Sequence, residues 1–230
     1  MSFVLRNLTL RPGDDEGRLP ALAAHACGLP PAALLEFRIL RKGVDARKKP
    51  RVLLVYSVAF DLADEERFWS RHQEIPNLER LSPEPVQSFS TAVHREPVVI
   101  AGMGPAGLFC ALRLTAYGIA ATLLERGKPV EQRVQDVARF WREGSLDRES
   151  NVQFGEGGAG TFSDGKLTCR LRDPNTAWVL EQLVQFGAPA EIRYQAKPHV
   201  GTDRLRTVVA AIRSTLQTRG CDIRFSTCLT

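Results

Sequence analysis

Residues 98–112 read VVIAGMGPAGLFCAL, and this stretch decides how the second half of the chain is expected to fold. Four apolar residues, typical of a buried strand, lead directly into a glycine-rich turn. The turn opens a helix that is expected to end at Gly118. The segment IAATLLE at 119–125 predicts the next strand. The pattern therefore indicates one βαβ unit.

The turn carries three glycines at the spacing of a dinucleotide-binding fingerprint. Gly102 permits the tight turn, Gly104 lets the backbone approach a diphosphate, and Gly107 lets the helix pack closely on the strand. Pro105 and Ala106 complete the turn, and we include them in the predicted cofactor-binding set. The N–H groups at the helix N-terminus suit an anion. A structural βα turn without a ligand is the alternative interpretation.

Glu125 closes the second strand about 20 residues after the glycines, where the fingerprint requires an acidic residue. Its carboxylate is expected to accept hydrogen bonds from ribose hydroxyls and to repel a 2′-phosphate. The chain then continues with an amphipathic helix that places Val130, Val134, Val137 and Trp141 on one face. Because a dehydrogenase fold would instead continue with further βα units, this departure favours FAD over NAD.

A second glycine cluster, NVQFGEGGAGTFSDGKL at 151–167, follows that helix. Together with VVIAGMGPAGLFCAL, LLERGKPVEQR and KPHVGTDRL, it resembles the bacterial NAD(FAD)-utilising dehydrogenases. These are flavoproteins with a glutathione-reductase-type FAD domain. The basic stretch RKGVDARKKPRVLLVYSV resembles the small N-terminal domain of the same family, so the resemblance covers nearly the whole chain.

The resemblance implies an FAD-dependent oxidoreductase that transfers hydride or electrons through the flavin. NAD(P)H is a candidate electron donor, and the small-molecule substrate is unknown. FAD would contact the fingerprint glycines and Glu125, with Arg126 in the same set and Arg133 near the diphosphate and flavin. Members of the family are longer, and their later strand ending in a Gly-Asp pair is missing before Thr230. We therefore expect a fragment of a longer enzyme.

The second glycine cluster is expected to lie against the flavin. Side chains at Gly157, Gly158 and Gly160 would block close approach of the backbone to a flat ring and its phosphates. Successive N–H groups there could form an anion-binding concavity. The alternative is a flexible surface loop, against which the flanking Phe154 and Phe162 argue.

Three polar residues in the family-like motifs, Asp164, Lys166 and His199, are candidates for proton transfer near the flavin. Positioning of a loop is the alternative role for each. The stretch GTFSDGK at 160–166 also matches GxxxxGK of a P-loop, but Leu167 stands where Ser or Thr would hold magnesium. We expect no metal site, because the sequence has neither CxxC nor Cys/His zinc spacing.

The N-terminal region differs from the rest in charge. Of the net charge of +5, residues 1–60 account for all, with ten Lys/Arg and five Asp/Glu, whereas residues 61–230 hold 21 of each. Residues 1–61 predict a small basic α/β domain of plait-like type, with the order strand, helix, strand, strand. Residues 62–96 predict a linker with a short helix, and 97–230 the first part of a Rossmann-like FAD-binding domain.

A competing hypothesis comes from the basic run RKGVDARKKPR at 41–51, which could contact the phosphates of a nucleic acid. The chain would then be a non-enzymatic RNA- or protein-binding module with a Rossmann scaffold. The aromatic RNP1 pattern of RNA-binding plaits is missing. The sequence shows neither a signal peptide nor an apolar run long enough to span a membrane, which predicts a cytoplasmic protein with reduced thiols.

Overall fold

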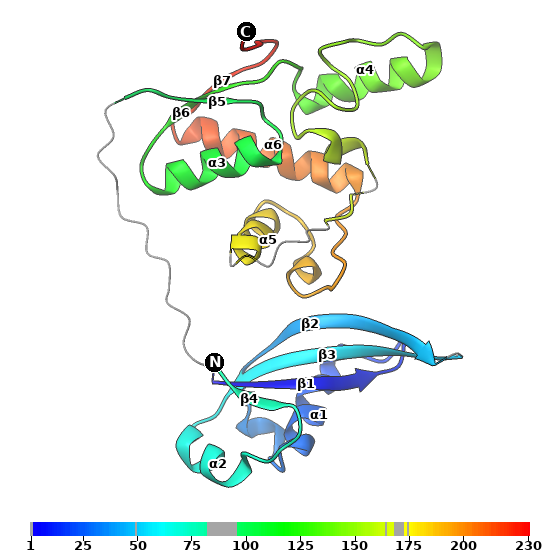
Figure 1. The fold of residues 1–230 in the computed structure, drawn as a ribbon, viewed down its shortest axis with the longest axis vertical. Helices are drawn as coiled ribbons and strands as arrows, with labels where there is room; N and C mark the ends of the chain where they lie inside the picture. Colours follow the sequence, from blue (N-terminus) through cyan, green and yellow to red (C-terminus); the bar gives the residue numbers. More distant parts are fainter. Residues whose placement is uncertain (1, 49, 82–95, 164, 168–172, 174) are drawn as a thin grey trace. The chain divides into compact units, whose positions relative to one another are not determined.

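The computed structural model describes residues 2–48, 50–81, 96–163, 165–167, 173 and 175–230 (Figure 1). The expected mixed α/β class is confirmed, because the chain forms one antiparallel and one parallel sheet. It divides into two compact units, Met1–Val86 with Arg193–Pro198, and Gln87–Ile192 with His199–Thr230. Each unit is described by itself below.

The first unit is a four-stranded antiparallel sheet with two helices. Its sheet order is β2-β3-β1-β4, and both helices lie on one side of the sheet (Figure 1). This order and the chain sequence βαββαβ are those of a split βαβ plait. In chain order the elements are β1 (Phe3–Leu10), α1 (Leu19–Ala26), β2 (Leu35–Lys48), β3 (Arg51–Asp61), α2 (Glu65–His72) and β4 (Leu78–Arg80).

Alternation along the strands builds the core of this unit. Phe3 in β1 and its cross-strand partner Phe60 in β3 point to the same face and are fully buried. Phe68 of α2 packs edge-on against Phe3, with ring centroids 5.3 Å apart. Aromatic pairs of this geometry add to the burial of apolar area, so the two helices are held to one face of the sheet.

The region expected to be a linker, residues 62–96, is more structured than the sequence indicates. The predicted short helix is α2, but β4 is an additional strand, in which Leu78 pairs with Leu5 of β1. Leu78 is buried in the same core, and this burial explains why residues 62–81 belong to the first unit. Residues 82–95 lie outside the described residues. The basic run at 41–51 is a hairpin in which Lys48 pairs with Arg51, and most of it lies within β2.

The second unit contains a three-stranded parallel sheet in the order β5-β6-β7. Ala111 and Leu112 of α3 and Ile212 and Leu216 of α6 are buried together in its core. The helix α4 buries Val130 and Val137, but Trp141, expected on the same face, is 65% exposed. The elements are β5 (Val98–Ala101), α3 (Pro105–Ala116), β6 (Ala121–Leu124), α4 (Val130–Glu143), α5 (Asn175–Gln185), α6 (Thr202–Thr218) and β7 (Asp222–Arg224).

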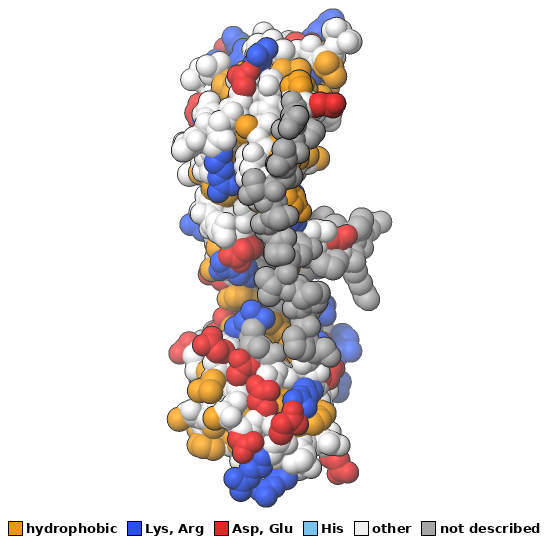
Figure 2. All heavy atoms as spheres, turned by 90° about the vertical axis from the view of Figure 1, so that its left-hand side faces the viewer, with side chains coloured by type: hydrophobic (Ala, Val, Ile, Leu, Met, Phe, Trp, Pro, Cys, Tyr) orange, Lys and Arg blue, Asp and Glu red, His pale blue; other side chains and the backbone are white. Residues whose placement is uncertain are grey.

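The surface of the first unit is mixed in charge. On the face turned to the viewer in Figure 2, acidic and basic side chains lie next to one another. Ion pairs of this unit include Arg6 with Glu79 at 2.8 Å and Arg80 with Glu66. Among the helices that the structure describes, none combines the length and apolar character needed to cross a membrane.

Candidate functional site

The turn after β5 is held close to the first turn of α3. Gly102 has φ +94°, a backbone conformation that favours glycine, and its amide donates to the Leu124 carbonyl at 2.7 Å. A Cβ on Gly107 would lie 2.0 Å from the carbonyl oxygen of Gly102. Glycine is therefore favoured at position 102 by its positive φ and required at position 107 by the close contact of turn and helix.

Gly104 differs from these two glycines, because neither its surroundings nor its backbone angles require glycine. A Cβ built on Gly104 would meet no atom within 4 Å outside its chain neighbours, and its backbone angles, φ −70° and ψ −177°, suit any residue. Leu108 is the first amide to bond back into α3, to the Gly104 carbonyl at 3.0 Å. The amides of Ala106 and Gly107 thus have no acceptor within the helix, and Pro105 has none to offer. Space and N–H groups coincide at this helix N-terminus.

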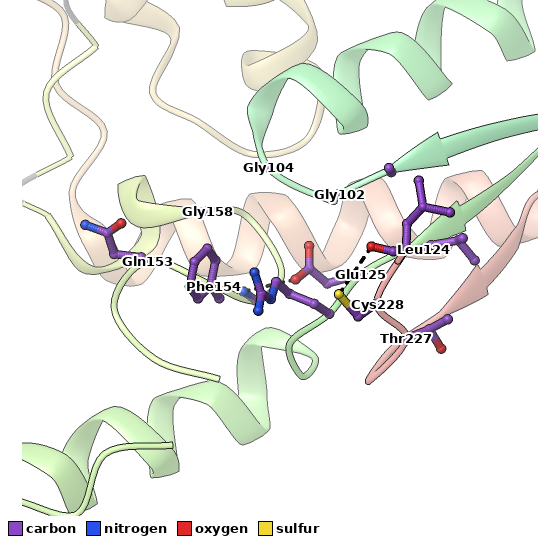
Figure 3. A pocket seen from close by; sticks show the side chains of 13 residues that line it. Gly102, Gly104, Leu124, Glu125, Gln153, Phe154, Gly158, Thr227 and Cys228 are labelled. Atoms are coloured by element: carbon purple, nitrogen blue, oxygen red, sulfur yellow. Dashed lines mark hydrogen bonds between the residues drawn. The ribbon is translucent and has the colours of Figure 1, made fainter. Parts of the chain in front are cut away.

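A cavity of about 370 Å³ lies beside this turn (Figure 3). In Figure 3 the Glu125 side chain lies between the Gly102–Gly104 turn and the segment that carries Phe154. The ring of Phe154 supports the guanidinium of Arg126 at 4.2 Å, and Arg126 also pairs with Glu149 at 2.7 Å. The cavity is lined by residues at and after the carboxyl ends of the parallel strands and by residues of the second glycine cluster at 151–167, which we call the glycine stretch. The lining residues are Ala101, Gly102, Gly104, Leu124, Glu125, Arg126, Gln153, Phe154, Gly155, Gly158, Thr227, Cys228 and Leu229.

The Glu125 carboxylate is only 4% exposed, and backbone amides hold it in place. Its Oε2 accepts from the amide of Met103 at 2.7 Å, and its Oε1 accepts from Gly127 at 2.8 Å and Gly155 at 3.1 Å. A carboxylate oxygen has two lone pairs, so Oε2 keeps capacity for one further donor. Glu125 therefore ties the turn to the glycine stretch, a role that the sequence does not predict.

The glycine stretch packs against the Gly102–Gly104 turn. The Gly157 amide donates to the Met103 carbonyl at 2.8 Å, and a Cβ on Gly158 would lie 3.4 Å from Gly104 Cα. Of the three glycines expected near the flavin, only Gly158 lines the cavity. A Cβ on Gly157 would meet Thr161 Cγ2 at 2.5 Å, whereas one on Gly160 would make an ordinary 3.6 Å contact with Leu205. Contacts within the chain explain the need for glycine at 157.

Arg133 is fully buried, and the glycine stretch folds around it. Its guanidinium donates to the carbonyls of Asn151 at 2.7 Å, Val152 at 2.8 Å, Glu156 at 2.7 Å and Gly158 at 2.8 Å. Burial lowers its pKa to about 10, although the nearby carboxylates of Glu125 and Glu156 act against this. The expected contact of Arg133 with a diphosphate is not what the structure indicates, because backbone carbonyls already engage its donors.

A second buried charge lies in the same stretch. The Glu156 side chain is fully buried, and its Oε2 accepts from Arg213 at 2.6 Å and from the Val130 amide at 2.8 Å. Its Oε1 has no hydrogen-bond partner among the described residues. Burial raises the pKa of Glu156 to about 7. Arg213 also pairs with Glu131 at 2.6 Å, so α4, α6 and the glycine stretch meet at one ionic cluster.

Two of the three candidate proton-transfer residues meet in the fold. Lys166 and His199 are partners in an isolated antiparallel bridge, and the Val200 amide donates to the Gly165 carbonyl at 3.0 Å. The motifs GTFSDGKL and KPHVGTDRL are thus adjacent in space. Neither residue lines the cavity beside Gly104. Asp164 lies outside the described residues.

The P-loop alternative finds no support in the segment before the GxxxxGK match. A P-loop follows a strand, but residues 151–157 form bends and turns, and Ala159–Phe162 form a short 3-10 helix. Residues 168–172, where the helix of a P-loop would begin, are not among those described. Within the described ranges, no group of three or more His, Cys, Asp or Glu side chains is arranged to hold a metal ion.

Five of the predicted cofactor-binding residues line the cavity: Gly102, Gly104, Glu125, Arg126 and Gly158. The other six do not: Pro105, Ala106, Gly107, Arg133, Gly157 and Gly160. Sequence reasoning missed the wall formed by Gln153 and by Thr227 to Leu229. The strand order would have revealed residues 227–229, because they follow β7, which pairs with β6, and the carboxyl ends of parallel strands share one edge of the sheet.

Two basic residues in the run at 41–51, Lys42 and Arg47, form ion pairs with acidic side chains of the chain itself. Lys42 pairs with Glu16, which also accepts from the Tyr56 hydroxyl at 3.0 Å, and Arg47 pairs with Asp45 at 2.7 Å. The run therefore presents less unpaired positive charge to a partner than its composition indicates.

Comparisons with known proteins give two similarities. The model of a domain of unknown function (DUF8436) matches residues 4–61, which run from β1 to the end of β3. The chain is similar to an uncharacterized protein of Clostridium beijerinckii, with 39% identity over 228 residues. The alignment covers 98% of this chain and 43% of that protein, so the chain spans under half the length of this relative.

Proposed function

We propose that the cavity beside Gly104 binds the ADP half of FAD, and that the whole protein is an FAD-dependent oxidoreductase. The single observation that carries the proposal is the open space at Gly104, which lines the cavity and directly precedes the first turn of α3, where the amides of Ala106 and Gly107 have no acceptor within the helix. The strand order gives further support, because β5, β6 and β7 are neighbours in the order of strands 1, 2 and 3 of a dinucleotide-binding fold.

The residues present suit this cofactor. The amides of Ala106 and Gly107 and the positive end of the α3 dipole would hold the diphosphate. Oε2 of Glu125 would accept a ribose hydroxyl, and its negative charge would disfavour a 2′-phosphate at the same place. When bound, the flavin supplies the hydride or electron transfer, and the protein supplies binding and orientation.

The glycine stretch then acts mainly as a support. Arg133 donates a hydrogen bond to the Gly158 carbonyl, and Glu125 accepts one from the Gly155 amide, so both side chains hold the backbone of the stretch. Gly158 itself lines the cavity with main-chain atoms alone. We expect these residues to position the cofactor site by holding the two glycine segments together, with only Gly158 near the ligand.

The test is a binding titration of the 230-residue chain with ADP and with FAD by calorimetry. Gly104→Val should leave folding intact, because the Cβ meets no atom, but should weaken ADP binding at least about tenfold by blocking the diphosphate. Gly160→Ala is the matched control and should change the affinity less than about twofold.

Two results would count against the proposal. One is wild-type protein that binds neither ADP nor FAD at millimolar concentration, and the other is a folded Gly104→Val protein with unchanged affinity. A preparation that instead binds labelled RNA, with an affinity that falls steeply with salt, would favour the nucleic-acid module.

We also propose that the protein works in a reducing compartment. Cys27, Cys110, Cys221 and Cys228 are free thiols in the structure, which supports work in a reducing compartment such as the cytoplasm. The substrate and the electron acceptor of the longer protein would be tested on the full-length relative.

A further inference from the structure

The first unit has a hollow of its own, of about 340 Å³, between α2 and the start of β2. Its walls are mainly apolar and include Leu29, Leu35, Leu62 and Phe68. Leu35 is 45% exposed, so the apolar surface of the hollow is accessible to a ligand. The volume lies at the lower end of the range for ligand cavities, so a small molecule would fill it.

The charged residues of α2 are sorted by face. Glu66 pairs with Arg80, and Glu65 accepts a hydrogen bond from the Ser2 hydroxyl, so the acidic side chains are engaged away from the hollow. Arg67 and Arg71, one turn apart, both line the hollow. Neither takes part in any salt bridge among the residues that the structure describes. Like charges at this spacing destabilise a helix unless an anion joins them.

The other polar groups at the rim have local partners. Asp64 caps α2 by accepting from the Arg67 amide at 3.2 Å, and His72 Nδ1 donates to the Phe68 carbonyl at 2.9 Å. The His72 ring stacks on Phe68, with centroids 4.5 Å apart, and so extends the apolar wall. The two guanidinium groups are therefore the polar feature of the hollow that a ligand would satisfy.

We propose that this hollow binds a small amphipathic carboxylate, with its apolar body against the leucines and Phe68 and its carboxylate between Arg67 and Arg71. A guanidinium matches a carboxylate by a two-pronged hydrogen bond. An inorganic anion would gain nothing from the apolar walls, and a neutral apolar molecule would leave the arginine pair without a counter-charge. The site is independent of the proposed FAD site, since all its residues lie in the first unit.

The experiment compares octanoate, octanol and inorganic phosphate as probes of the 230-residue chain by calorimetry. Octanoate should bind, octanol should bind at least fivefold more weakly, and phosphate should not bind measurably. The double variant Arg67→Ala/Arg71→Ala should lose at least tenfold in octanoate affinity, with octanol unchanged. The matched control Arg38→Ala/Arg51→Ala removes the same charge from exposed positions outside the hollow. It should change the octanoate affinity less than twofold.

A second variant tests the apolar wall. Leu35→Glu places a negative charge at an exposed position of the hollow, so folding should survive while octanoate binding falls at least tenfold. The proposal is overturned if octanoate does not bind the wild type at millimolar concentration. It is equally overturned if both arginine double variants weaken octanoate alike, or if octanol binds as tightly as octanoate.

Discussion

The amide of Gly157 donates a hydrogen bond of 2.8 Å to the carbonyl of Met103, and this contact joins two glycine segments that are far apart in the sequence. Met103 lies in the turn before α3, and Gly157 lies in the stretch that folds around Arg133. The Glu125 carboxylate links the same two segments a second time, because it accepts hydrogen bonds from the amides of Met103 and Gly155. A change in either segment should therefore affect the other.

Gly157→Ala should destabilise the second unit by about 2 kcal/mol, through strain at φ +81° and a Cβ only 2.5 Å from Thr161 Cγ2. Gly160→Ala, three residues later, makes an ordinary contact and should cost less than about 0.5 kcal/mol. Urea unfolding of both variants measures the difference. Equal stabilities of the two variants would contradict the packing described for the stretch.

Gly107→Ala should destabilise the protein by about 3 kcal/mol, because the added methyl would overlap the Gly102 carbonyl at 2.0 Å. Gly104→Ala, at an open position with extended backbone angles, should be near neutral. Thermal unfolding followed by circular dichroism separates the two. A Gly104→Ala protein as unstable as Gly107→Ala would show that the turn is closed by contacts other than those described.

Arg133→Met should cost about 3 kcal/mol or more, because it leaves several buried carbonyls without a donor. Arg133→Lys should recover little, since an ammonium cannot span carbonyls on both sides as the guanidinium fork does. Arg142→Ala is the control, because its side chain is 69% exposed and pairs with the neighbouring Glu143. Chemical denaturation gives all three values, and a neutral Arg133→Met would refute the supporting role.

Glu156 should make stability fall as the pH rises from about 4.5 to 7. Its folded pKa of about 7 lies above the ordinary glutamate pKa of 4.5, so within this window the folded state holds a proton that the unfolded chain has lost. The contribution is complete below the unfolded pKa and is lost as the pH passes the folded one, with a total of about 3 kcal/mol at most. Glu156→Gln should flatten this slope in urea titrations at pH 5 and pH 8. A slope equal to that of the wild type would contradict the assignment.

The cysteines should differ in reactivity. Burial raises the pKa of the Cys27 thiol to about 11, so Cys27 should resist a thiol reagent at pH 8 until the chain unfolds. Cys110 and Cys228 are exposed and should react at once. Peptide mapping after a short pulse of iodoacetamide identifies the modified residues. Rapid labelling of Cys27 in the folded protein would show that the core around it opens readily.

The βαβ unit could be predicted because its signals are local. Strand, turn and helix follow one another within residues 98–118, and the expected strand at 98–101 has the bounds of β5. The 2.0 Å contact between a Gly107 Cβ and Gly102 shows why the glycine spacing is informative. A side chain at Gly107 would separate the turn from the helix, whereas one at Gly102 would strain the backbone at φ +94°.

The interior of the site could not be predicted in this way, because its contacts join distant parts of the chain. The partners of Arg133 lie 18 to 28 residues away, and nothing in the helix pattern separates this arginine from exposed ones such as Arg139 and Arg142. The strand β4 escaped prediction because only Leu78 among its three residues is buried. Both cases depend on tertiary packing rather than on local propensity.

The connection from β6 to β7 has a consequence for how the polypeptide is made. It takes up about a hundred residues, including α4, the glycine stretch, α5 and α6, so the third strand joins the sheet through a very non-local pairing. During synthesis the hydrogen-bonding edge of β6 stays open until residue 224 has left the ribosome. We expect this interval to be when the nascent chain is most exposed to aggregation and most in need of chaperones.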